Sequence, residues 1–147
     1  MPCGILTRPL ICLKRKRNRM VNVKIDVKPM PSPRPRVYGK RTIMPKEYVN
    51  HKEMLKWHFN RFEHFGKGKI RLEVLFAFKM PARGLKRRMY DMPVPDIDNL
   101  VKTLMDSMQG ILFDDDRQIV EISAKKIYSE VNCYIVKMEK VNEDNRP

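Results

Sequence analysis

Residues 70 to 80 contain the pattern that most restricts the fold of this chain. Apolar side chains recur there at every second position, namely Ile70, Leu72, Val74, Phe76, Phe78 and Met80. Three of the five residues between them are charged. Alternation with a period of two is typical of a β-strand that buries one face. Because this face is apolar over its whole length, we predict a central strand of a sheet.

Weaker patterns on both sides of this strand predict the other elements. The first strand alternates until prolines from Pro29 onward end it, because proline cannot donate to a ladder of hydrogen bonds. The final two strands are separated by Ser129 and Glu130, which predict a tight hairpin turn. The predicted elements are strands at 21–27, 70–80, 118–128 and 132–141, and helices at 46–64 and 96–109.

The order β-α-β-α-β-β predicts an α+β protein, in which two helices accompany a mixed four-stranded sheet. A chain of 147 residues is long enough to bury one core, so we expect a single small domain. This domain should span residues 20–141. Residues 1–19 have no usable period and predict a basic, disordered N-terminal arm, and residues 142–147 predict a polar tail.

The charge of the chain favours a polyanionic partner. Lys and Arg number 31 against 17 Asp and Glu, which gives a formal net charge of +14. Nucleic acid is therefore the first partner to consider. No apolar stretch approaches the roughly 20 residues that a membrane span needs, so we expect no membrane partner. The odd set of cysteines lacks the spacing of a disulfide framework or a zinc site and suits the reducing cytoplasm.

Two predicted loops are rich in basic residues. The loop after the first strand mixes basic side chains with Tyr38, and the loop before Asp96 adds further arginines. Such loops suit contacts to the DNA backbone, although a solvated loop has the same composition. The candidate DNA-binding residues are Arg34, Arg36, Lys40, Arg41, Arg87 and Arg88.

An acidic island interrupts this basic chain. Six aspartates within 21 residues surround a single base, Lys102; they are Asp96, Asp98, Asp106, Asp114, Asp115 and Asp116. Carboxylates gathered in this way repel a DNA backbone unless a divalent cation neutralises them. Helix caps and turns also favour Asp, so the island has a purely structural alternative. Lys102 could contact a phosphate or simply pair with an aspartate one turn away.

The stretch from Pro95 to Lys126 resembles the RusA family of Holliday junction resolvases, which are endodeoxyribonucleases common in bacterial prophages. The family pattern is Asp-x-Asp-Asn, then a Lys, a Gly and a paired Asp-Asp before a Val-rich strand. The matching residues are Asp96, Asp98, Asn99, Lys102, Gly110, Asp115, Asp116 and Val120. Asp114 turns the usual pair into a triplet, which leaves two registers for the second acidic group.

This resemblance implies specific roles for these residues. Asp96, Asp98 and Asp116 would be the catalytic carboxylates that bind metal, Asp115 nearby would be a further metal-binding carboxylate, and Lys102 would be the catalytic lysine. The cofactor would be Mg²⁺, with Mn²⁺ as a substitute. A homodimer would act on four-way DNA junctions in recombination and repair, in the bacterial cytoplasm and associated with the nucleoid.

Two other functions remain open at the level of sequence. The chain could be a non-catalytic nucleic-acid-binding protein, whose aspartates only cap helices and keep it soluble. It could also be a nuclease of the same chemistry that acts on flaps, replication forks or RNA.

Overall fold

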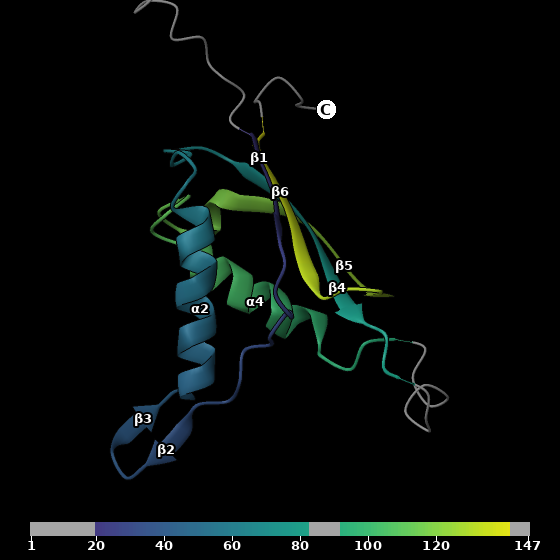
Figure 1. Ribbon diagram of the computed structural model, residues 1–147. Helices are drawn as coiled ribbons and strands as arrows, with labels where there is room; N and C mark the ends of the chain where they lie inside the picture. Colours follow the sequence, from purple (N-terminus) through teal and green to yellow (C-terminus); the bar gives the residue numbers. More distant parts are fainter. Residues whose placement is uncertain (1–19, 83–91, 142–147) are drawn as a thin grey trace, which may run out of the picture.

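The computed structural model describes residues 20–82 and 92–141 (Figure 1). The strands are β1 (Met20–Ile25), β2 (Arg36–Tyr38), β3 (Arg41–Ile43), β4 (Ile70–Lys79), β5 (Ile119–Ser129) and β6 (Cys133–Lys140). The helices are α2 (Lys46–Phe59), α4 (Ile97–Met108) and the short 3₁₀ helix η1 (Asp116–Gln118). The predicted arm at 1–19 and tail at 142–147 lie outside the described residues.

Four strands form one mixed sheet in the order β1-β6-β4-β5. Strand β4 pairs antiparallel with β6 and parallel with β5, and β1 pairs antiparallel with β6. The predicted α+β fold with a mixed four-stranded sheet and two α-helices is therefore confirmed for the described residues.

Strand β4 is central, as its sequence pattern predicts. Leu72, Val74, Phe76 and Phe78 are buried against the helices, and hydrogen-bonded strands flank β4 on both sides. Figure 1 shows α2 and α4 on the same side of the sheet. The buried core lies between the helices and this face; its helical members include Leu55, Phe59, Leu100, Leu104 and Met108.

The predicted hairpin between the last two strands is wrong. Strands β5 and β6 are not neighbours, because β4 lies between them. The connection at residues 130–132 instead crosses the end of β4, where the Asn132 side chain accepts a hydrogen bond from the Lys79 backbone N–H at 2.8 Å. A strand that is apolar on one face gains most from partners on both edges, and this long-range pairing overrides the local turn signal.

Two local expectations also change. Helix α2 ends at Phe59, five residues before the predicted end at 64, yet Phe62 still packs against the core from the turn that follows. The first basic loop contains the short hairpin β2–β3, whose turn has Gly39 at a φ of 59°. Residues other than glycine rarely adopt that backbone conformation, so Gly39 permits the turn.

We expect Phe76→Ala to destabilise the domain by about 3–5 kcal/mol, because its ring is fully buried at the centre of the core. Trp57→Ala is the matched control, because this large aromatic side chain is 65% exposed. Its cost should stay below about 1 kcal/mol. Urea denaturation of both variants checks this expectation, and equal losses of unfolding free energy would contradict it.

Candidate functional site

The first acidic pair lies at the N-terminal end of α4. Asp96 is the N-cap residue, but its side chain makes no capping hydrogen bond, and only its backbone carbonyl accepts a bond from Leu100 N–H, at 3.2 Å. Asp98 lies in the first turn, and both aspartates are exposed. The capping alternative therefore does not account for the Asp96 carboxylate, which stands at the positive end of the helix dipole.

Lys102 follows one turn after Asp98 on α4 and is exposed. Within the described parts of the chain, no aspartate lies within 4.0 Å of the Lys102 ammonium group. The simple ion pair between Lys102 and Asp98 is thus not formed. An unpaired ammonium beside exposed carboxylates suits a contact to a phosphate.

The aspartate triplet differs from residue to residue. Asp114 contacts the His64 ring at 3.1 Å. Asp115 accepts from the Arg117 backbone and guanidinium and forms a capping box with Gln118 at the start of η1. The Arg117 hydrogen bonds hold the pKa of the Asp115 carboxyl well below its usual range. Asp115 therefore has a clear structural role.

Asp116 is the exposed member of the triplet that forms no ion pair in the described residues. Of the three carboxylates, that of Asp116 is therefore the one left open to an external partner within the described residues.

The two acidic groups are far apart within one chain. Asp96 and η1 lie beyond opposite ends of α4, whose twelve residues span about 18 Å (Figure 1). The sheet register gives a similar separation: Ile119, just after η1, pairs with Ile70, whereas Lys126, which contacts the Pro95 carbonyl, pairs with Phe76. Six strand residues cover about 20 Å.

The chain runs back toward the start of α4 only as β5, after the aspartate triplet, so the triplet itself stays near the C-terminal end of the helix. The chain turns at Gly110, and the Leu112 carbonyl accepts from Phe65 N–H at 2.7 Å. Gln118 donates to the Gly66 carbonyl at 2.8 Å, which ties η1 to the loop before β4. Across residues 20–82 and 92–141, no three His, Cys, Asp or Glu side chains form a group that could hold a metal.

The basic residues of the first loop lie on the exposed hairpin β2–β3, except Arg34, which comes two residues before it. Arg34, Arg36, Lys40 and Arg41 are all exposed, and Tyr38 is 61% exposed among them. Figure 1 shows this hairpin projecting beyond the N-terminal end of α2. The Pro-rich segment before the hairpin is fixed to the domain by three bonds: Met30 N–H to the Tyr134 hydroxyl, Tyr48 hydroxyl to Ser32, and Ser32 N–H to the Asn99 carbonyl. Arg87 and Arg88 lie outside the described residues.

The segment that leads into α4 is held by residues that sequence reasoning missed. Lys126 donates to the carbonyls of Pro93 and Pro95, each at 2.8 Å, and the Tyr128 hydroxyl donates to the Met92 carbonyl at 3.0 Å. The only signal in the sequence is a lysine at a position of β5 that faces the core. These contacts join residues more than thirty positions apart, so no local pattern shows them.

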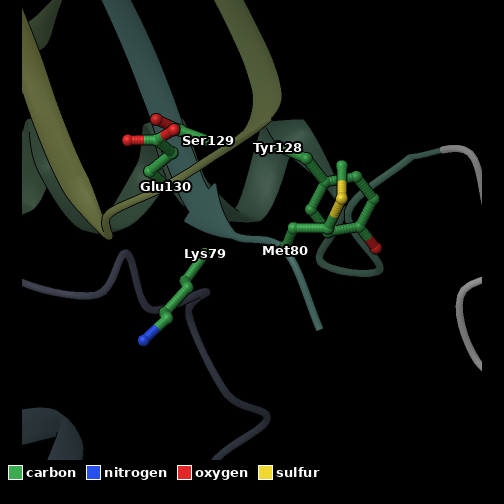
Figure 2. Close-up of a pocket in the computed structure, with 5 residues that line it drawn as sticks. All are labelled: Lys79, Met80, Tyr128, Ser129 and Glu130. Atoms are coloured by element: carbon green, nitrogen blue, oxygen red, sulfur yellow. The ribbon is translucent and has the colours of Figure 1, made fainter. Parts of the chain in front are cut away.

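Two hollows lie at the end of β4, near this segment. Lys79, Met80, Tyr128, Ser129 and Glu130 line the first (Figure 2). The second, of about 720 Å³, shares Lys79, Met80 and Tyr128 and reaches Pro95. Figure 2 shows Glu130 on one side of the end of β4, and Tyr128 and Met80 on the other side. The carboxylates of the acidic island line neither hollow.

Comparison with known proteins gives two findings. The family described as Endodeoxyribonuclease RusA matches residues 26–139 of this chain. The Bacillus subtilis (strain 168) protein described as "Uncharacterized protein YqaN" is 42% identical over 36 residues, which cover 24% of this chain and 25% of that relative. In the described part of the chain, no helix is long and apolar enough to cross a membrane.

We expect Asp115→Asn to lower the melting temperature above pH 5, because it removes the ion pair with Arg117. The pKa of Asp115 is depressed in the folded state, so the ionised carboxylate stabilises the fold above its unfolded pKa of about 3.9. This contribution disappears as the pH falls through the folded pKa. The difference in melting temperature between wild type and variant should therefore shrink below about pH 4.

Asp106→Asn is the control for this measurement, because Asp106 is exposed on α4 and forms no ion pair in the described residues. Its melting temperature should follow that of the wild type across the same pH range. A difference for Asp115→Asn that is constant from pH 7 to pH 2.5 would contradict the assigned ion pair.

Proposed function

Because the chain belongs to the RusA endodeoxyribonuclease family, we propose that it is a divalent-metal-dependent endonuclease that resolves four-way DNA junctions. The observation that carries the proposal is the pair of exposed aspartates, Asp96 and Asp98, at the start of α4 in a chain of net charge +14. Neither carboxylate forms an ion pair within the described residues. If the protein only bound the phosphates of DNA, these negative charges would weaken that binding.

Oxygen ligands of this type suit Mg²⁺, with Mn²⁺ as a substitute. We assign Asp96, Asp98 and Asp116 as the metal-binding carboxylates. They would hold the cation, which when bound would supply the Lewis-acid chemistry of phosphodiester hydrolysis. In this proposal Lys102, exposed one turn after Asp98, holds the scissile phosphate and offsets its charge, and Asp115 orients the turn that presents Asp116.

The separation of the two acidic groups supports a homodimeric site. At 1.5 Å per residue, Asp96 is about 18 Å and Asp98 about 15 Å from the end of α4 that leads to Asp116, which is too far for ligands of one ion. A two-fold axis can bring the Asp96 end of one subunit to the partner's Asp116. Two such sites would then face the paired strands of a four-way junction.

The hairpin β2–β3 is the proposed contact to the DNA backbone. Its basic residues are exposed, and Tyr38 can pack on a sugar or base. Arg87 and Arg88 remain proposed contacts from the second basic loop. We place the activity in recombination and repair within the bacterial cytoplasm, at the nucleoid, and a prophage origin is consistent with the family.

We expect Asp98→Asn and Asp116→Asn each to lower junction cleavage roughly 100-fold or more, because each removes a proposed metal ligand. Junction binding in EDTA should stay equal or tighten, since one charge that repels the backbone is lost. Asp106→Asn is the matched control, an exposed aspartate of α4 farther from its N-terminus, and should cleave nearly as well as wild type.

Mixing the two inactive variants tests the shared site. A heterodimer of Asp98→Asn and Asp116→Asn subunits contains one site with both substitutions and one intact site, so mixing should restore nicking of one strand. If each chain carried its own complete site, the mixture would stay inactive. A wild-type protein that binds junctions but cuts no DNA with Mg²⁺ would favour the non-catalytic alternative, and faster cleavage of flaps, forks or RNA would revise the substrate.

Replacing Arg36 or Arg41 by Ala should weaken binding to all DNA sequences alike, because phosphate contacts carry no sequence information. Each replacement should reduce the slope of log affinity against log salt by about 1. Filter binding between 50 and 200 mM salt, a range in which such slopes are steep, checks this expectation. Glu53→Gln on α2 is an exposed control that should leave the slope unchanged.

A further inference from the structure

The segment from Met92 to Asp96 leads into α4 with little backbone structure of its own. It contains Pro93 and Pro95, which have no N–H group to donate. Three of its carbonyls nevertheless accept hydrogen bonds, and all three bonds come from two side chains of β5, those of Lys126 and Tyr128. One strand therefore fixes the backbone that immediately precedes the first acidic pair.

Lys126 occupies an unusual position for a lysine. In the parallel register it pairs with Phe76, and its neighbours on the same face, Ala124 and Tyr128, pair with Val74 and Phe78. This face of the sheet is covered by the helices, and Lys126 is half-buried. Removing an ammonium group from water is unfavourable unless strong hydrogen bonds replace the lost hydration.

The two carbonyls supply those bonds. Both contacts are 2.8 Å long, as expected for charge-assisted hydrogen bonds. Lys125, the preceding residue, points to the opposite face and is exposed. A polar residue that breaks the pattern of a buried face often serves a functional site. Here, the contacts of Lys126 lead to the residue before Asp96.

We propose that Lys126, assisted by Tyr128, is a positioning residue that fixes Asp96 and Asp98 for metal binding. The bond to the Pro95 carbonyl fixes the peptide that joins Pro95 to Asp96, and the bond to Pro93 fixes the turn before it. The inference rests on the proposed metal-dependent function. It adds that metal affinity is controlled by a side chain that touches neither metal nor DNA.

The test compares Lys126→Met with Lys125→Met, which removes the same charge from the exposed face of the same strand. Junction cleavage is measured under single-turnover conditions across a MgCl₂ titration, and junction binding is measured in EDTA. Loss of an outer-shell partner commonly lowers metal affinity about 10- to 100-fold. We therefore expect Lys126→Met to raise the half-saturating Mg²⁺ concentration about 10-fold, with DNA binding in EDTA matching that of Lys125→Met.

A second readout does not depend on activity. Amide hydrogen exchange of residues 100–103, the first hydrogen-bonded N–H groups of α4, should be faster in metal-free Lys126→Met than in metal-free Lys125→Met, because the start of α4 loses its anchor. Tyr128→Phe should produce a smaller change in the same direction. Lys126→Arg should retain part of the wild-type Mg²⁺ response, because it keeps a charged donor. If Lys126→Met does not fold, Tyr128→Phe and Lys126→Arg still test the proposal.

The outcomes separate the competing roles. Weaker DNA binding in EDTA with an unchanged Mg²⁺ response would overturn the proposal and make Lys126 a phosphate contact. Equal Mg²⁺ curves and equal exchange for Lys126→Met and Lys125→Met would also overturn it. If wild type cuts no junction at any Mg²⁺ concentration, the proposed function fails, and unchanged exchange at residues 100–103 would then separately overturn the positioning role.

Discussion

Hydrogen bonding along both edges of β4 is the constraint on which the rest of this structure depends. The antiparallel edge receives β6, and the parallel edge receives β5. A parallel neighbour requires a crossover connection, which α4 provides while burying Leu100, Leu104 and Met108 against the sheet. The same crossover places Asp96 at one end of the helix and Asp116 beyond the other. Central pairing of one apolar strand thus determines where the carboxylates stand.

The charges of the domain are divided between two kinds of environment. On the open face of the sheet, Arg71 bonds Glu121 at 2.7 Å and Glu139 at 2.9 Å, so its charge is neutralised within the fold. Asp96 and Asp98 form no ion pair in the described residues. Exposed carboxylates without an internal partner are available to an external cation, and the exposed arginines on the β2–β3 hairpin are available to an external polyanion. This division of charge is what the proposed metal-dependent nuclease would use.

Much of the fold follows from local patterns, and the errors arise where distant residues compete with them. The alternation at 70–80 predicts β4 correctly because period and burial are properties of one strand. The hairpin expected at Ser129 and Glu130 fails because β5 gains a longer pairing with β4 than a turn to β6 could offer. Helix α2 ends at Phe59, although the helical spacing of apolar residues continues to Phe62. Phe62 still packs against the core, but from the turn that follows the helix.

The sequence by itself determined the chemical character of this protein: an acidic island in a chain of net charge +14, a family pattern from Asp96 to Val120, and the types of most elements. These are properties of neighbouring residues. Only the tertiary structure decided that Asp115 is engaged by Arg117, that Lys126 holds the backbone before Asp96, and that the two acidic groups lie at opposite ends of α4. Each of these depends on strand order and register, because those set which side chains from distant parts of the chain come within hydrogen-bonding distance.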